Sequence, residues 1–425
     1  MTFENSLTFA RQLDAKDPLA SYRNKYHIPV INGNEQIYFC GNSLGLQPKA
    51  TKSYLETELN DWASLGVEGH FQGKNPWFEY HKFTQEKAAK VVGAKKDEVV
   101  LMNTLTTNLH LLMVSFYRPT KTRYKIVVEA AAFPSDHYTV ESQARFHGYN
   151  PDDAVIQLHP RDGEECLRTE DILQAIEDNG DEIALVMLGG VNYYTGQFFE
   201  LDKITKKGHE VGAVVGFDLA HAAGNIDLKL HDWDIDFGVW CTYKYLNSGP
   251  GGVGGIFVHE RHANNPKLPR FSGWWGYKEE TRFQMKPGFI PMEGAAGWQL
   301  SNAQILPMAA HWAALDLFDE VGIAALRKKS ELQSAYVFDL INGINERAGK
   351  TVFKILTPND PKQRGGQISI VAMSNGKETF NHLTKNNIIV DWREPDVIRI
   401  APVPMYNTFK DIFNFAQVLE SSLTK

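Results

Sequence analysis

The chain has 425 residues, 43% hydrophobic and 22% charged, which are ordinary values for a globular protein with a large core. Its 44 basic and 51 acidic side chains give a formal net charge of −7, which argues against a general nucleic-acid-binding protein. The N-terminal residues are polar, and the longest apolar tracts are too short to span a membrane. The three cysteines form no CxxC pair, so we expect a cytoplasmic protein without disulfides.

The first part of the chain predicts a helix, an irregular region at 38–50 and a second helix at 51–65. From about residue 86, helical segments alternate with short apolar runs, which is typical of an α/β fold with a mostly parallel sheet covered by helices on both faces. We place these strands at 124–130, 183–188, 213–218, 237–242 and 255–260. Ligands bind at the carboxyl ends of the strands in such sheets, so the polar residues that follow them are candidate site residues.

The pattern changes beyond residue 303. A long helix leads into a smaller α+β region with expected strands at 367–373, 387–392 and 397–403. We therefore expect three parts. They are an N-terminal segment at 1–50 associated with the small domain, a large cofactor-binding domain at 51–305, and a small C-terminal α+β domain at 306–425.

Asp218 and Lys244 are the most informative candidate residues. Asp218 lies in FDLAHAAGN and Lys244 in CTYKYLNSGPGG, and each ends or follows an apolar run of strand character. Pyridoxal phosphate requires a lysine amine that holds its aldehyde as a Schiff base and a carboxylate at its pyridine nitrogen. Taken singly, a strand-end cap and an exposed lysine explain these two residues as well. The pair favours the cofactor.

Two motifs that open helices leave two interpretations open. NTLTTNLHLLMVSF at 103–116 has Thr and Asn residues that are suited to capping the helix, and the same helix end could bind a phosphate. In FPSD at 133–136, Phe133 could stack on a flat ring while Ser135 and Asp136 bind its edges. A Pro-Ser-Asp turn that opens a helix explains this second motif equally well.

Three further positions are also ambiguous. Tyr243 could relay a proton beside the lysine, or it could be an ordinary core tyrosine. Arg399 lies in an apolar strand and needs an anionic partner, which could be a ligand carboxylate or a structural ion pair. Trp274 and Trp275, in FSGWWGY, could form an aromatic wall or belong to the core.

Two short motifs are false leads. The tract at 249–254 matches GxGxxG, but it precedes an expected strand, whereas a dinucleotide-binding loop opens a helix. The His-Glu-Arg-His run at 259–262 has the wrong spacing for a zinc-binding HExxH helix, so we assign no metal.

In its motifs and their order, the chain resembles the kynureninase family of fold-type I pyridoxal phosphate hydrolases. The similarity runs from GNSLGLQPK at 41–49 to RIAPVPMYNTF at 399–409, with NTLTTNLHLLM, AFPSDHY, FDLAHAAGN, TYKYLN and SGWWG between them in family order. The resemblance implies hydrolysis of L-kynurenine or 3-hydroxy-L-kynurenine to L-alanine and anthranilate or 3-hydroxyanthranilate. That reaction belongs to tryptophan catabolism and NAD biosynthesis. The resemblance also implies a homodimer with shared active sites.

The resemblance assigns roles to individual residues. Lys244 would form the Schiff base with pyridoxal 5'-phosphate, Asp218 would bind the pyridine nitrogen, and Tyr243 would be the candidate acid. The other implied cofactor contacts are Leu105, Thr106, Phe133, Ser135, Asp136, His221, Tyr243, Trp274 and Asn302. The implied substrate contacts are Arg399 at the α-carboxylate and His70, Asn302 and Ser43 at the aromatic end. The pair His70 and Asn302 favours 3-hydroxykynurenine.

Two positions depart from the family pattern. Gly189 replaces a frequent Ser or Thr near the cofactor, and Tyr277 replaces a frequent His in the substrate pocket. Other fold-type I enzymes, such as a cysteine desulfurase-like lyase or an aminotransferase, remain the alternative. A desulfurase needs a mobile, activated cysteine, whereas Cys241 lies in a strand-like run and Cys40 and Cys166 have no activating neighbours in the sequence.

Overall fold

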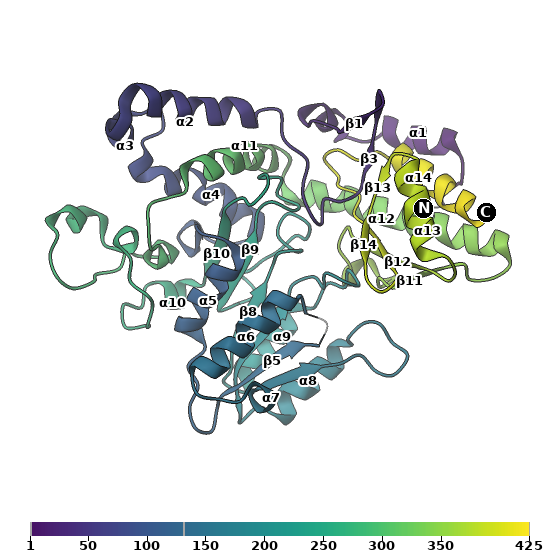
Figure 1. Ribbon diagram of the computed structural model, residues 1–425. Helices are drawn as coiled ribbons and strands as arrows, with labels where there is room; N and C mark the ends of the chain where they lie inside the picture. The colour runs from purple at the N-terminus through teal and green to yellow at the C-terminus, as the bar shows by residue number, and fades with distance from the viewer. Residues whose placement is uncertain (1, 131, 425) are drawn as a thin grey trace.

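The computed structural model describes residues 2–130 and 132–424, which are built around two sheets of unequal size (Figure 1). Within these residues the larger sheet has seven strands in the order β4-β10-β9-β8-β7-β5-β6. In that order they are Val99–Leu101, Gly254–Val258, Phe237–Cys241, Val214–Asp218, Ile183–Gly189, Lys125–Glu129 and Val155–Leu158. β9, β8, β7, β5 and β6 are parallel, whereas β10 is antiparallel to both of its neighbours.

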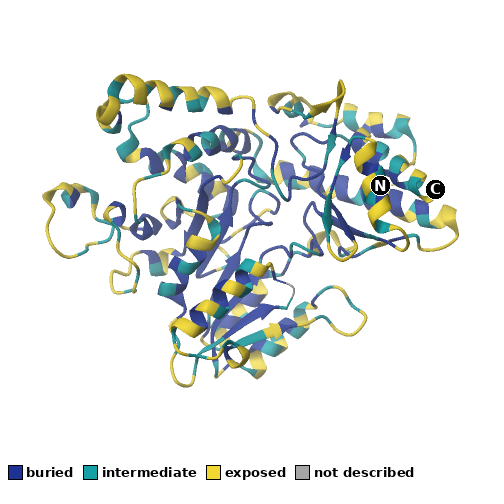
Figure 2. Ribbon diagram, viewed as in Figure 1, coloured by how far each residue is buried: buried dark blue, intermediate teal, exposed yellow. Residues whose placement is uncertain are grey.

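The large sheet is buried on both faces because successive side chains enter two different hydrophobic cores. Val127 and Val186 are paired in register and contribute to one core, while Ile126 and Leu185 contribute to the other. Figure 2 shows the central strands in dark blue between partly exposed helices, whereas the edge strand β6 is only partly buried. The helices that contribute most of the other side chains of these cores are α4 (Tyr80–Val92), α5 (Leu105–Phe116), α6 (Pro134–Phe146), α8 (Thr169–Asp178), α9 (Leu201–Glu210) and α11 (Ile305–Val321).

The smaller sheet is antiparallel and has the order β11-β12-β15-β14. Its strands are Phe353–Ile355, Ile368–Ala372, Val397–Ile400 and Asp391–Arg393. Its core also takes side chains from α1 (Leu7–Ala15), α12 (Ile323–Ala348), α13 (Gly376–Lys385) and α14 (Phe409–Ser421). These helices surround the smaller sheet at the right of Figure 1.

The N-terminal segment contacts both parts of the molecule. β3 (Ile37–Tyr38) pairs with β13 (Ile388–Ile389), and Phe39 lies in the core of the smaller sheet. Tyr26 and Leu46 instead lie in the core of the larger sheet. The remaining elements of the chain are β1 (Val30–Ile31), β2 (Asn34–Glu35), α2 (Thr51–Leu65), α3 (Gly69–Gln72), α7 (Pro151–Ala154) and α10 (Glu260–Ala263).

The long helix α11 packs against α2 and α4. Its side chains Met308 and Leu315 belong to a core of the large sheet, whereas Tyr336 and Ile341 of α12 belong to the core of the small sheet. Leu326, in the first turns of α12, still belongs to the core of the large sheet, so the change from one core to the other falls within α12. Across residues 2–130 and 132–424, none of the helices has the length and apolar character needed to cross a lipid bilayer.

The predicted α/β class and mostly parallel sheet are confirmed. The sequence analysis missed the three- and four-residue strands β4, β6 and β11, which are too short to show a periodic pattern. The single strand expected at 387–392 is two short strands that pair with different partners. The GxGxxG tract precedes β10, as expected for a loop that does not bind a dinucleotide.

Candidate active site

The candidate site lies where the carboxyl ends of β5, β7, β8 and β9 meet. Asp218 is the last residue of β8, and Lys244 follows the end of β9 by three residues. A cavity of about 190 Å³ opens at this edge of the sheet. The predicted residues that line it are Leu105, Thr106, Phe133, Ser135, Asp136, Asp218, His221, Tyr243 and Lys244. The structure therefore brings together residues that span 140 positions of the sequence.

The amine of Lys244 contacts two other residues that line this cavity. Its Nζ is 2.9 Å from Nε2 of His221 and 5.8 Å from the centroid of the Phe133 ring. Burial, and then the positive charge of Lys244, lower the pKa of His221 well below its ordinary value. The imidazole is therefore neutral at neutral pH and can accept a hydrogen bond from the lysine amine.

Asp218 and Asp136 form a hydrogen-bonded pair of buried carboxyl groups. Asp218 Oδ1 also accepts a hydrogen bond of 2.7 Å from the amide of Ala220. Burial, followed by the negative charge of Asp218, raises the pKa of Asp136 well above its ordinary value. For Asp218, burial raises the pKa, while the Ala220 amide and Lys244 partly offset it. The pair thus carries a proton, which Asp136 holds more strongly.

The N-terminus of α5 faces the cavity with Leu105 and Thr106. Thr104 is the N-cap residue, but its side chain makes no capping hydrogen bond, so the capping interpretation does not hold for this residue. Its hydroxyl instead lies 3.3 Å from that of Thr107. Because no side chain caps this helix end, its first amides remain available to an anion.

The FPSD motif opens a helix, and the same residues lie at the cavity. Phe133 is the N-cap residue of α6, and Pro134 occupies the first turn, where its missing amide hydrogen costs nothing. The same turn places Phe133, Ser135 and Asp136 in the cavity wall. A helix start and part of the cavity wall are therefore built from the same residues.

Tyr243 lies beyond the end of β9, in a bend that brings it to the cavity together with Lys244. Its hydroxyl is hydrogen-bonded to the thiol of Cys241. Burial, and then the neighbouring Cys241, raise the pKa of Tyr243 above its ordinary value, so the phenol keeps its proton at neutral pH. Tyr243 can therefore act as a proton donor.

Comparison with known proteins places this geometry in a family. Residues 326–419 match the family described as the kynureninase C-terminal domain. A relative named Kynureninase from Flavobacterium johnsoniae is 52% identical, with 100% of this chain and 99% of the relative covered. Relatives of the same name from Myxococcus xanthus and Nematostella vectensis are 56% and 46% identical over 98% of this chain, with 97% and 94% of each relative covered. The chain belongs to the kynureninase family.

Solved structures with the same fold support the architecture of this family member. A cysteine desulfurase from Thermococcus onnurineus superimposes with a TM-score of 0.77 at 17% identity, over 95% of this chain and 98% of that one. A complex of the cystine C-S lyase C-DES with its product cysteine persulfide gives a TM-score of 0.74 at 16% identity, over 90% of this chain and 97% of the other. At this level of identity, the similarity shows the fold alone.

In this kynureninase-family chain, Arg399 is buried and engaged with neighbouring residues rather than lining the cavity. It is 1% exposed, forms an ion pair with Asp391, and donates a hydrogen bond of 2.6 Å to the carbonyl of Tyr193, which lines the cavity. Its Nε has no hydrogen-bond partner among the described residues. Ser43 Oγ donates a 2.6 Å hydrogen bond to the same carboxyl group of Asp391. The structural ion pair is therefore present, and one buried donor of Arg399 remains available.

Four other predicted residues lie outside the cavity of the single chain. These residues are His70, Trp274, Asn302 and Tyr277. His70 Nδ1 lies 3.0 Å from the carbonyl of Val67, and its ring packs edge-on against Trp77. Trp274 is 44% exposed, whereas its neighbour Trp275 is 2% exposed, so only Trp275 belongs to the core.

The sequence analysis missed several residues around the cavity. Glu129, Val191, Tyr193 and Ala220 line it beside Gly189, and Asp391 binds Arg399. Glu129 ends a strand-like run, so its sequence context is that of an ordinary strand terminus. Tyr193 and Asp391 belong to none of the motifs quoted from the sequence, and the fold brings them next to Arg399.

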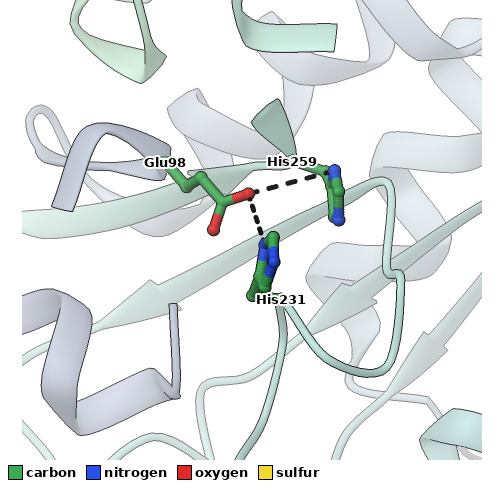
Figure 3. Close-up of side chains that lie close together, drawn as sticks. All are labelled: Glu98, His231 and His259. Atoms are coloured by element: carbon green, nitrogen blue, oxygen red, sulfur yellow. Dashed lines mark hydrogen bonds and ion pairs between the residues drawn. The ribbon is translucent and has the colours of Figure 1, made fainter. Parts of the chain in front are cut away.

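A second cluster, formed by Glu98, His231 and His259, lies at the opposite edge of the large sheet (Figure 3). Its potential ligand atoms lie within 4.8 Å of one another. However, Glu98 Oε1 accepts hydrogen bonds from the amide of Glu260 at 2.8 Å and from His231 Nδ1 at 2.9 Å. His259 Nδ1 accepts one of 3.3 Å from the amide of Arg261. These contacts cap α10, so the cluster has a structural explanation.

Proposed function

We propose that this protein is a pyridoxal 5'-phosphate-dependent kynureninase. It hydrolyses L-kynurenine, 3-hydroxy-L-kynurenine or both to L-alanine and the corresponding anthranilate. The observation that carries the proposal is identity of about 50% over the full chain to relatives named Kynureninase. The cavity that contains Lys244 and Asp218 supports it.

The residues of the cavity fit this cofactor. Asp136 Oδ1 and His221 Nδ1 are buried and have no hydrogen-bond partner among the described residues, as expected where a ligand supplies the partner. Lys244 would hold the cofactor covalently through its amine, and Asp218 would bind the protonated ring nitrogen. Phe133 would stack on the ring, and the free amides at the start of α5 would bind the phosphate.

When bound, pyridoxal phosphate supplies an electron sink for the negative charge that develops at the substrate Cα and Cβ. Lys244 Nζ is the group that removes the proton from Cα, and His221 orients it through their hydrogen bond. Asp218 keeps its negative charge beside the ring nitrogen, because Asp136 holds the shared proton more strongly. Tyr243 holds a proton at neutral pH and would deliver it to Cβ after the Cβ–Cγ bond is cleaved.

Arg399 would bind the α-carboxylate of the substrate. We expect Arg399→Lys to raise KM for either substrate by about 10–100-fold, because a lysine cannot reproduce the planar, bidentate geometry of the guanidinium. Arg393→Lys is the matched control. Arg393 also contacts Asp391 at 3.2 Å, but its side chain is 39% exposed. The KM of the Arg393→Lys variant should therefore stay close to that of the wild type. Steady-state kinetics of both variants test this, and an equal increase in KM would contradict the assignment.

The aromatic end of the substrate would be bound by residues from a second subunit. His70, Trp274 and Asn302 are partly or fully exposed and lie outside the cavity of their own chain, which is consistent with a homodimer that shares its active sites. In that arrangement, His70 and Asn302 would bind the ring hydroxyl of 3-hydroxykynurenine. We propose on this basis that 3-hydroxykynurenine is the preferred substrate.

We expect His70→Phe and Asn302→Leu to lower kcat/KM for 3-hydroxykynurenine by about 10-fold, the effect of losing one hydrogen bond. Turnover of kynurenine, which lacks this hydroxyl, should change much less. Ser43→Ala is the control: its hydroxyl bonds Asp391, so the variant should affect both substrates alike. Specificity constants for the two substrates check this, and equal losses in the His70 and Asn302 variants would remove the hydroxyl-recognition role.

A cytoplasmic protein in tryptophan catabolism and NAD biosynthesis is also part of the proposal, and its three unpaired thiols agree with a reducing compartment. The small domain would comprise residues 306–425 with the associated segment 1–50, as expected from the sequence. The packing of α11 on α2 and α4, with Leu326 of α12 in the same core, favours a later boundary, within the first turns of α12.

A desulfurase-like activity is the alternative, because chains with that name share the fold. Such chemistry needs a reactive thiolate. Burial raises the pKa of Cys40 to about 12 and that of Cys166 to about 11, and it also raises the pKa of Cys241. These thiols therefore stay protonated at neutral pH. Product analysis with kynurenine, 3-hydroxykynurenine and cysteine tests the proposal: alanine with an anthranilate supports it, and sulfide release would overturn it.

A further inference from the structure

Glu129 is a buried carboxyl group in the wall of the cavity that the proposed mechanism does not use. It is the last residue of β5 and is 3% exposed. Its two carboxyl oxygens each lie 3.1 Å from the amide nitrogen of Gly189, which donates to them. Burying a carboxyl group costs free energy unless it is hydrogen-bonded or paired with a positive charge. Glu129 has the hydrogen bond from Gly189 but no ion pair within the part of the chain that the structure describes, so its burial requires an explanation.

The side chain of Glu129 occupies the space in which a side chain at residue 189 would lie. A Cβ atom on Gly189 would be only 2.8 Å from Glu129 Oε1. Gly189 is not among the described residues with positive φ, so space rather than backbone conformation requires glycine here. Gly189 pairs in register with Asp218, and residues paired in this way present their side chains on the same face of a sheet. The carboxyl group of Glu129 therefore lies on the face of the sheet that carries Asp218.

The backbone links Glu129 to Asp218 by a short path. Gly189 donates to Glu129, and the next amide, that of Gly190, donates a 2.7 Å hydrogen bond to the carbonyl of Asp218. We propose that Glu129 is a positioning residue for Asp218, acting through the Gly189–Gly190 backbone and replacing a hydroxyl side chain at residue 189. The effect of Glu129 on cofactor binding rests on the proposed function. The packing of Glu129 against residue 189 does not.

The groups that face Glu129 explain how its charge depends on pH. They are the Gly189 amide on β7, Asp218 on β8 and Asp136 on α6, with the ammonium group of Lys244 beside the two aspartates. Burial raises the pKa of Glu129 to about 7, its own backbone amide and the Gly189 amide lower it, and Asp218 raises it further. The unfolded carboxyl group titrates near 4.5. Below about pH 4.5 Glu129 is protonated in both the folded and the unfolded chain, and its ionisation does not affect the free energy of unfolding. As the pH rises from about 4.5 to about 7 its ionisation lowers the free energy of unfolding, and above about pH 7 the loss is complete.

A double-mutant cycle on the full-length protein tests the packing, with and without saturating pyridoxal phosphate. Gly189→Ala should lower the Tm, because its Cβ displaces the Glu129 carboxyl group. In the Glu129→Ala background the same change should lower the Tm by less than half as much, because the space is then free. Equal decreases in the two backgrounds would overturn the proposal. This outcome does not depend on whether kynurenine is a substrate.

Cofactor binding tests the positioning role. Glu129→Ala should weaken pyridoxal phosphate binding by about 10–100-fold and shift the absorbance of the bound cofactor, as expected when a group that orients a ligand-binding residue is lost. Glu129→Gln keeps an oxygen acceptor for the Gly189 amide, so it should restore most of the affinity. Ionisation of Glu129 should make the wild-type Tm fall between about pH 5 and pH 8. Glutamine cannot ionise, so in Glu129→Gln this contribution to the fall should be absent. If Gln and Ala behave alike, Glu129 does not position Asp218.

Discussion

Lys244→Ala should abolish turnover and remove the visible absorbance of the protein-bound cofactor. The variant loses both the amine that holds the cofactor and the base that takes the Cα proton, so we expect kcat to fall by at least about 10⁴-fold. Absorbance spectra of the purified protein and single-turnover assays with kynurenine measure the two effects separately.

Lys244→Arg is the matched control for charge. It keeps a positive charge beside Asp218 and His221, so the protein should remain folded and retain part of its cofactor affinity. A guanidinium group is always protonated and can neither form the covalent link nor accept the proton, so turnover should be lost as in the alanine variant. A variant without Lys244 that retained both turnover and absorbance would refute the assignment.

Asp218→Asn should lower kcat by about 10²–10³-fold, the range seen when one electrostatic partner of a reaction is removed. An amide cannot keep the ring nitrogen protonated, so the electron sink is weakened. We also expect weaker cofactor binding. Cofactor titration and kcat for kynurenine check both effects.

Asp136→Asn provides the comparison. Because burial and the charge of Asp218 keep Asp136 protonated, asparagine imitates its neutral form and should lower kcat by no more than about tenfold. If Asp136→Asn proved the more damaging change, Asp136 rather than Asp218 would be the partner of the ring nitrogen. Equal effects would mean that the two carboxyl groups act as one unit.

The sequence predicted the parts of the fold that repeat a strong local pattern. Long apolar runs identified β5, β7, β8, β9 and β10 because a strand buried on both faces must be continuously hydrophobic. The antiparallel direction of β10 depends on tertiary packing and leaves no such pattern. The sequence also left open whether Thr104 caps the helix that follows it, because a sequence shows that a residue can cap a helix but not whether it does.

The cofactor side of the site was more predictable than the substrate side. Lys244, Asp218, Asp136 and His221 follow strands that end at one edge of the sheet, so the rule for parallel sheets was sufficient. Arg399 lies in the smaller sheet and reaches the site only through the packing of the two sheets. His70, Trp274 and Asn302 lie outside the cavity of their own chain, and no local pattern in the sequence indicated that position.

Glu129 shows why a departure from a family pattern is informative. The sequence indicated that Gly189 lacks a hydroxyl group, but it could not identify what replaced it. The replacement comes from a residue 60 positions earlier, on the adjacent strand β5. A pairing of this kind depends on strand order, which follows from the fold and not from spacing along the chain.

Cleavage in ¹⁸O-labelled water tests the central claim most directly. Kynurenine and water should give alanine and anthranilate in equal amounts, with one ¹⁸O atom in the anthranilate carboxylate, because water adds to the γ-carbonyl before the Cβ–Cγ bond breaks. Mass spectrometry of both products measures the label and the stoichiometry. Unlabelled anthranilate, or a keto acid in place of alanine, would contradict the assignment of this chain as a kynurenine hydrolase.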